Sequence, residues 1–188
     1  FNWRCHNSKK NFWKNMNSKI IKTLTIFFIL FGLIKNINAD EPKLSDSHQF
    51  NFFSGVFDIN TSSKKSSELF GIQHSNEDLF RDTFLGKLSP ITGFMMTADS
   101  TTYLYTGVQA EYKIGKLNLT PSFSPGLYSM GDGKDLGSPL EFKSELQLSV
   151  DLGPDTKLGY SQSHLSNAGL DEKNPGADSY MFNFMKSF

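Results

Sequence analysis

Residues 178–188 read Asp-Ser-Tyr-Met-Phe-Asn-Phe-Met-Lys-Ser-Phe, and this stretch decides the fold. Its aromatic side chains fall on even positions, at Tyr180, Phe182, Phe184 and Phe188. A two-residue alternation is the pattern of a β-strand whose two faces meet different surroundings. The stretch carries no 3.6-residue apolar stripe, so a strand with one aromatic face is predicted here.

Similar alternation recurs through the chain upstream of this stretch. Together with it, segments separated by turns rich in Gly, Ser, Asp, Asn and Pro lie near residues 49–59, 67–75, 89–98, 102–113, 116–128, 139–150, 156–166 and 178–188. Residues 77–88 leave open a helical turn or a ragged extension of a strand. The even number of segments is typical of a barrel of antiparallel strands in a membrane.

Composition and charge exclude several classes of protein. The mean hydropathy of −0.36 excludes a bundle of membrane helices but not a membrane barrel, whose lumen is polar. Cys5 is the only cysteine among the 188 residues, so a disulfide framework and a cysteine zinc site are both excluded. Residues 40–188 hold 12 basic and 19 acidic side chains, a net charge of −7, which argues against a nucleic-acid partner.

The first 39 residues have the layout of an export signal. Lys19 and Lys22 precede an apolar run of 11 residues at 24–34, and Ala39 is a small residue at the expected cleavage point. The run is too short to cross a bilayer as a helix, which needs about 20 residues. We therefore expect a cleaved signal peptide at 16–39 and a mature domain at 40–188. Residues 1–15 are expected to be an upstream extension that is untranslated or unstructured.

Alternation by itself does not separate a membrane barrel from a soluble β-sandwich or a lipocalin-like barrel. A strand that ends on an aromatic residue, here Phe188, resembles the C-terminal signature of bacterial outer-membrane proteins. Combined with export and the lack of cysteine after Cys5, it favours an all-β, eight-stranded antiparallel transmembrane β-barrel in the bacterial outer membrane. A barrel of this size is filled by side chains, so a pore is not expected. A homodimer is left open.

Candidate catalytic residues lie where the last two strands meet. His164 and Ser166 are two residues apart on a predicted strand, so their side chains project to the same face within about 7 Å. The returning strand begins with Asp178, whose even position also predicts the lipid-facing side. A serine nucleophile, a histidine base and a carboxylate that orients the histidine are the groups needed for acyl transfer. Asn167 and Asn174 in the connecting loop are candidate amide donors to an oxyanion.

Spacing alone leaves two interpretations of these residues open. Serine and histidine are common at the rim of a barrel, and Asn174-Pro175-Gly176 is ordinary turn chemistry. Polar side chains on a lipid-facing surface are unfavourable, however, which favours a functional role. His48 and His74 show no such pattern and are expected to be solvated or to face the lumen.

Two blocks of sequence resemble the lipid A 3-O-deacylase (PagL-like) family of outer-membrane enzymes. The first is 164–169 (His-Leu-Ser-Asn-Ala-Gly) with 174–176 (Asn-Pro-Gly). The second comprises 121–128 (Pro-Ser-Phe-Ser-Pro-Gly-Leu-Tyr), 131–133 (Gly-Asp-Gly) and 136–142 (Leu-Gly-Ser-Pro-Leu-Glu-Phe). The similarity extends from roughly residue 90 to the C-terminus.

The resemblance implies a barrel that hydrolyses the 3-O-linked 3-hydroxyacyl chain of lipid A in lipopolysaccharide, without a metal or other cofactor. His164 would then be the base, Ser166 the nucleophile and Asp178 the acid, with Asn174 at the oxyanion hole. The usual acid in this family is Glu, one methylene longer than Asp178, and Glu172 is the fallback. The alternatives are a non-catalytic scaffold or adhesin and an esterase that acts on phospholipids.

Overall fold

The computed structural model describes residues 48–59, 66–76, 81–83 and 86–188. Its strands, in chain order, are β1 (His48–Phe57), β2 (Ser67–Asn76), β3 (Arg81–Thr83), β4 (Gly86–Thr97), β5 (Thr102–Ala110), β6 (Tyr112–Ile114), β7 (Leu117–Ser129), β8 (Leu140–Asp151), β9 (Thr156–Ser166) and β10 (Ala177–Ser187). None of the described residues belongs to a helix long and apolar enough to span a membrane.

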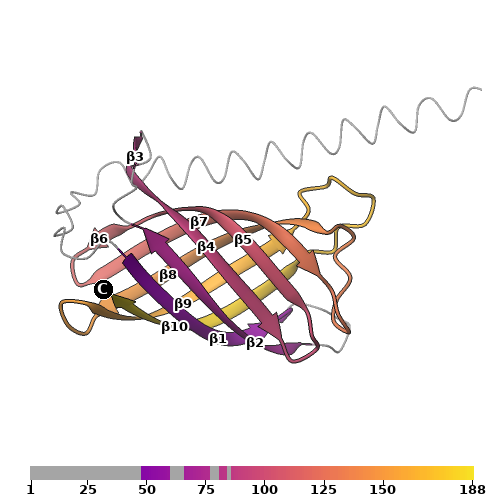
Figure 1. Ribbon diagram of the computed structural model, residues 1–188, viewed down its shortest axis with the longest axis horizontal. Helices are drawn as coiled ribbons and strands as arrows, with labels where there is room; N and C mark the ends of the chain where they lie inside the picture. Colours follow the sequence, from indigo (N-terminus) through magenta and orange to yellow (C-terminus); the bar gives the residue numbers. More distant parts are fainter. Residues whose placement is uncertain (1–47, 60–65, 77–80, 84–85) are drawn as a thin grey trace, which may run out of the picture. The chain divides into compact units, whose positions relative to one another are not determined.

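The eight long strands close into one antiparallel barrel (Figure 1). β1 pairs with β2 on one side and with β10 on the other, and the β2–β4 pairing completes the circle. The two short strands extend the ladder as hairpins, β3 against β4 and β6 against β7. The prediction of an eight-stranded barrel is confirmed. Within 77–88, the part described forms strands rather than a helical turn.

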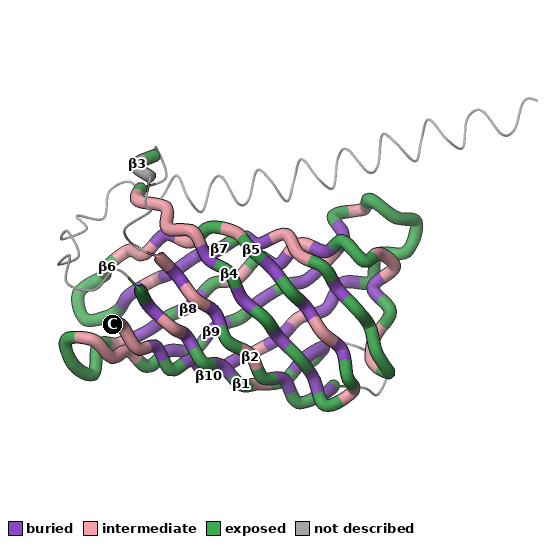
Figure 2. The backbone as a smooth tube through the Cα atoms, in the orientation of Figure 1, coloured by how far each residue is buried: buried purple, intermediate pink, exposed green. Residues whose placement is uncertain are grey.

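The outer surface of the barrel is apolar. Exposed and buried residues alternate along each long strand, as Figure 2 shows. The exposed positions carry large hydrophobic side chains, among them Phe70, Phe94, Leu104, Leu146 and Phe182. A water-soluble barrel turns such residues inward, so this surface faces lipid, as in outer-membrane barrels.

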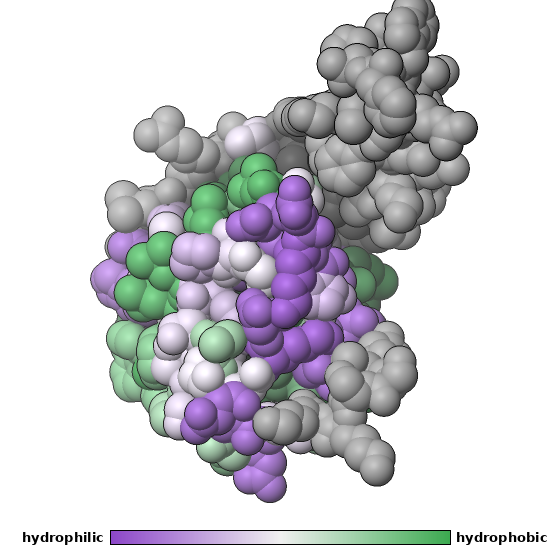
Figure 3. Space-filling view, turned by 90° about the vertical axis from the view of Figure 1, so that its right-hand side faces the viewer, coloured by the Kyte–Doolittle hydropathy of each residue, from purple (hydrophilic) through white to green (hydrophobic). Residues whose placement is uncertain are grey.

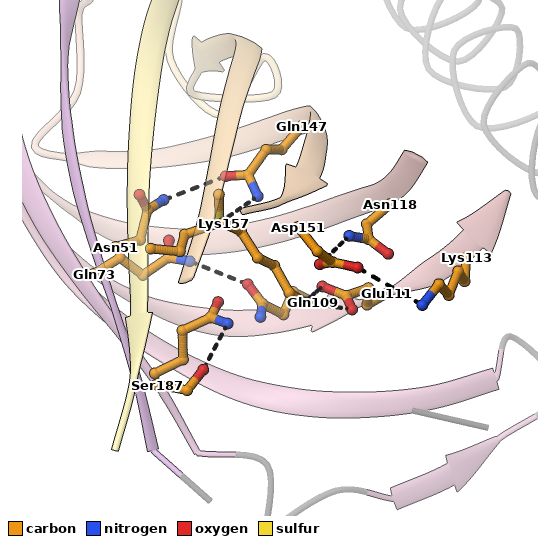
Figure 4. Close-up of polar contacts among 12 residues, drawn as sticks. Asn51, Gln73, Gln109, Glu111, Lys113, Asn118, Gln147, Asp151, Lys157 and Ser187 are labelled. Carbon is orange, nitrogen blue, oxygen red and sulfur yellow. Dashed lines mark hydrogen bonds and ion pairs between the residues drawn. The ribbon is translucent and has the colours of Figure 1, made fainter. Parts of the chain in front are cut away.

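The lumen is filled with hydrogen-bonded polar side chains. The Asn51 amide donates to Gln147 at 3.3 Å, and the Gln73 amide donates to Gln109 at 3.1 Å (Figure 4). The Asn51 amide also donates to Asn183 at 3.0 Å. One buried charge is paired as well: the Lys143 ammonium, 3% exposed, lies 2.8 Å from a Glu145 oxygen. These contacts satisfy groups that would be costly to bury alone.

The barrel has two different ends. One end carries the loops 130–139 and 167–176, at the right of Figure 1, and is called the loop end; the opposite end carries the C-terminus and is called the Phe188 end. An apolar cluster fills the lumen towards the loop end, where it includes Phe57, Tyr103, Tyr128, Leu165 and Ala177. This packed cluster supports the ends of the strands that reach the loop end.

The structure bears differently on the expectations for the N-terminal segment and for His48 and His74. The predicted signal peptide at 16–39 and the extension at 1–15 lie outside the described residues, so both stay predictions. Of the two alternatives expected for His48 and His74, a lumen-facing position is excluded: both belong to the outward face, where Nδ1 of His48 lies 3.0 Å from Nε2 of His74. The β1–β2 register, which pairs Phe50 with His74, brings these distant residues together.

Candidate active site

The register of β9 and β10 brings the three predicted catalytic residues to one place. Asp178 is the direct cross-strand partner of His164, and Ser166 lies two residues further along β9. The inward neighbours Leu165 and Ala177 are each 2% exposed, whereas the side chain of His164 is 53% exposed. The three residues therefore share the outward face of the barrel at the loop end.

His164 and Asp178 are joined by a short hydrogen bond. The distance from His164 Nδ1 to Asp178 Oδ1 is 2.7 Å, typical of a contact with a charged partner. Asp178 thus reaches the imidazole despite being one methylene shorter than Glu. Glu172 lies exposed in the connecting loop, with its backbone N–H bonded to the Asp171 side chain. Asp178 is therefore the carboxylate that the fold brings to His164.

Two serines flank His164 on the outward face. Ser166 is half-buried at the end of β9, and its cross-strand partner is Phe142 on β8. Ser144, also on β8, is the direct partner of His164 and is exposed. Sequence reasoning did not consider Ser144, because only the strand register reveals that β8 places it there.

The two loop asparagines have different surroundings. Asn167 is fully buried, and its amide donates to the carbonyl oxygens of Lys173 at 2.8 Å and Leu136 at 3.2 Å. Its side-chain oxygen accepts from the Gly169 N–H at 3.0 Å. Asn174 is exposed, and its side-chain oxygen accepts the Asn167 backbone N–H at 3.2 Å. Both hydrogens of the Asn167 amide are thus bonded within the loops, whereas the Asn174 bond uses the side-chain oxygen and not the side-chain nitrogen.

The loops 130–139 and 167–176 are tied together above the barrel. Lys173 Nζ lies 2.6 Å from Asp135 Oδ2, and this hydrogen bond, helped by the Gly137 N–H, holds the pKa of the Asp135 carboxyl below its usual value. Lys134 Nζ lies 2.6 Å from Asp58 Oδ1, which anchors the first loop to the end of β1. Figure 3 looks onto this end, where hydrophilic surface forms a band beside hydrophobic surface.

A profile of a known protein family matches the part of the chain that holds this site. The profile described as Lipid A 3-O-deacylase (PagL) matches residues 59–187, which is more than half of the chain and includes both strands of the site. The chain belongs to the lipid A 3-O-deacylase family. Its barrel and its outward-facing apolar surface agree with a place in the bacterial outer membrane.

A curated relative matches a shorter part of this lipid A 3-O-deacylase family member. Lipid A deacylase PagL of Bordetella bronchiseptica (strain ATCC BAA-588 / NCTC 13252 / RB50) is 36% identical over 55 residues, which are 29% of this chain and 31% of that protein. The chain therefore aligns with about a third of the length of this curated relative.

Solved structures support the fold of this family member. A crystal structure of the outer membrane enzyme PagL superposes with a TM-score of 0.56 at 18% identity, covering 74% of this chain and 99% of that one. A de novo designed transmembrane β-barrel reaches a TM-score of 0.50 at 10% identity, covering 80% and 99%. At these identities the likeness concerns the barrel alone.

Gly176 is a second residue beside His164, after Ser144, that the sequence does not reveal. The sequence predicts only a turn at this position, yet Gly176 lies so close to the His164 imidazole that a Cβ atom on it would be 2.8 Å from Cε1. Its left-handed φ of 62° follows from an Asn-Pro-Gly turn, but the contact depends on how the loop folds back over β9. No sequence signal predicts that contact.

Proposed function

We propose that this protein is an outer-membrane serine esterase that hydrolyses the 3-O-linked acyl chain of lipid A, with Ser166, His164 and Asp178 as a catalytic triad. One observation carries this proposal: the 2.7 Å His164–Asp178 bond lies on the outward face of a membrane barrel. Membership of the lipid A 3-O-deacylase family supports the choice of reaction and substrate.

Asp178 has the role of orienting the base. A carboxylate accepts a hydrogen bond, so His164 donates through Nδ1–H and keeps Nε2 free of a proton. Asp178 also stabilises the imidazolium that forms once Nε2 has taken a proton. The pairing therefore prepares His164 to act as a general base towards a neighbouring hydroxyl.

Ser166 is the nucleophile in this mechanism. Its hydroxyl approaches His164 Nε2 when the substrate binds, as catalytic hydrogen bonds often tighten only in the complex. The Ser166 oxygen bonds to the ester carbonyl carbon while its proton passes to His164. Collapse of the tetrahedral intermediate breaks the ester bond, and the 3-oxygen of lipid A leaves with that proton. Water, deprotonated by His164, then attacks the acyl-enzyme, and the hydroxy fatty acid is released as Ser166 takes the proton back from His164.

Asn174 is assigned to the oxyanion. Because its side-chain oxygen accepts the Asn167 backbone N–H, its amide hydrogens are directed away from that bond and are suited to donate to the developing negative charge. Asn167 is assigned a supporting role, since both hydrogens of its buried amide are given to backbone carbonyl oxygens.

The position of the site suits a substrate already dissolved in the membrane. With the Phe188 end towards the periplasm, the loop end lies at the outer leaflet, where acyl chains of lipopolysaccharide meet their headgroup. The ester then reaches the triad by diffusing along the leaflet, so an enclosed pocket is not needed. The mixed hydrophilic and hydrophobic surface of this end suits such an interface (Figure 3).

Mass spectrometry of lipid A tests the proposal. Refolded wild-type barrel is incubated with lipopolysaccharide beside Ser166→Ala and Ser144→Ala, the latter being the matched outward-facing serine next to His164. We expect the wild type and Ser144→Ala to remove one hydroxyacyl mass and Ser166→Ala to remove none. Unchanged lipid A with folded wild type contradicts the proposal, and cleavage of phospholipid alone assigns a different ester substrate.

A further inference from the structure

Gly176 contacts the catalytic histidine through its backbone. The residue is buried, has a φ of +62°, and lies just before β10. A Cβ atom built on it would lie 2.8 Å from Cε1 of His164, 3.2 Å from Nε2 of His164 and 3.4 Å from the carbonyl oxygen of Leu165. The edge of the imidazole that carries Cε1 and Nε2 therefore takes the space that a side chain at position 176 would fill, and it faces the Gly176 Cα.

We propose that Gly176 is a positioning residue for His164, an inference that rests on the proposed function. Asp178 fixes the imidazole through Nδ1, and that bond alone leaves the ring free to swing about it. The bare Cα of Gly176 limits this motion on the Cε1–Nε2 side. The two contacts together hold Nε2 on the face that Ser166 shares.

A methyl group at this position would disturb the ring rather than the fold. Real Cβ atoms do not approach other heavy atoms to 2.8 Å, so something must move. The atom met first is the far end of a side chain that is 53% exposed, and it yields more easily than backbone. The imidazole is therefore displaced, and either its bond to Asp178 or its approach to Ser166 is lost.

The chain offers a matched control in Gly115. This glycine, between β6 and β7 at the Phe188 end, has the same φ of +62° as Gly176. A Cβ atom built on it meets nothing within 4 Å. Gly115→Ala thus carries the same left-handed backbone strain as Gly176→Ala without any contact with the site.

The experiment compares Gly176→Ala and Gly115→Ala with the wild type in two ways. One readout is kcat and KM for lipid A. The second is the NMR signal of the His164 Cε1–H group, with His48 and His74 as internal references. We expect Gly176→Ala to lower kcat about 10- to 100-fold with little change in KM, because a displacement approaching 1 Å in a catalytic group has this scale of effect. The His164 signal should shift while the other two stay in place.

Two results would overturn the inference: an unmoved His164 signal in folded Gly176→Ala, or an equal loss of kcat in Gly115→Ala, which would assign the effect to backbone strain. If the wild type itself leaves lipid A intact, the proposed function fails. The NMR comparison still decides whether Gly176 holds the ring, and the rate of labelling of Ser166 by a fluorophosphonate replaces kcat as the kinetic readout.

Discussion

His164 and Asp178 are direct cross-strand partners on β9 and β10, and their side chains meet at 2.7 Å on the outward face of the barrel. Two residues 14 positions apart are thereby held by rigid strands rather than by a loop. Catalytic groups on strands are positioned more reliably than groups on loops.

Replacing the Asp178 carboxylate tests the pairing itself. We expect Asp178→Asn to lower kcat by about 10²- to 10⁴-fold, because an amide no longer enforces the Nδ1–H tautomer or stabilises the imidazolium. Asp178→Glu should keep most of the activity, since the carboxylate is preserved. Glu172→Gln is the matched control and should leave kcat unchanged. A loss of kcat in Glu172→Gln but not in Asp178→Asn would move the acid into the loop.

The two asparagines should separate activity from stability. Asn174→Ala is expected to lower kcat by about 10²- to 10³-fold, the usual effect of losing one oxyanion donor. Its unfolding midpoint in urea should fall less than that of Asn167→Ala, because it loses a single hydrogen bond, to the Asn167 N–H. Asn167→Ala should instead reduce the free energy of unfolding of the loop region by about 1–3 kcal/mol, because the carbonyl oxygens of Leu136 and Lys173 and the Gly169 N–H lose their partner.

Urea titrations and steady-state kinetics on both variants check this contrast. If Asn167→Ala loses kcat while its loops stay as resistant to protease as those of the wild type, its amide acts in the reaction. A fully active Asn174→Ala would remove Asn174 from the oxyanion hole.

The sequence predicts the strands and the shared face well, because the two-residue period is a local property. The positions of His164, Ser166 and Asp178 are enough to place all three on one side once β9 and β10 are neighbours. The even or odd position of a residue does not give the register between neighbouring strands, however. The direct pairing of Asp178 with His164, and of Ser144 with the same histidine, depends on how three strands align.

The contacts made by the loops could not be predicted from the sequence, for a different reason. Lys173 meets Asp135 across 37 intervening residues, and Gly176 packs on His164 only because its loop folds back. Nothing in the local pattern selects such partners. The His48–His74 contact on the outward face is a further example, set by the β1–β2 register.

Charge placed on the outer surface tests whether that surface faces lipid. Leu146 is 50% exposed near the middle of β8, and Leu152 is 63% exposed in the turn that follows this strand. We expect Leu146→Lys to lower the free energy of unfolding in phospholipid vesicles by about 2–4 kcal/mol, and Leu152→Lys by about 0–1 kcal/mol. Equal effects in urea titrations would contradict a lipid-facing band centred on the strands.

Acid should loosen the tie between the two loops. Since Lys173 and the Gly137 N–H lower the pKa of Asp135 in the folded protein, the tie is fully present above the ordinary Asp pKa of about 3.9. It is lost as the pH falls below that value through the folded pKa, because protonation then removes the charge that Lys173 binds.

Pepsin cleavage of these loops, measured for the wild type and Lys173→Gln between about pH 5 and 2, a range that spans the ordinary Asp pKa of about 3.9, checks the sign. The variant should be cleaved faster than the wild type at the upper end of the range, and the two rates should converge at the lower end. A constant ratio across the range would mean that the Asp135 carboxylate contributes nothing to the tie.

The most direct test of Ser166 as the activated nucleophile is to map where a fluorophosphonate attaches to the folded barrel. Trypsin separates the two outward serines, because Lys143, Lys157 and Lys173 place Ser144 in the peptide 144–157 and Ser166 in the peptide 158–173. We predict one phosphonyl group on Ser166 in the wild type, none in Ser166→Ala, and much slower labelling in Asp178→Asn. Labelling at Ser144, or an equal rate of labelling in the wild type and Asp178→Asn, would contradict the triad.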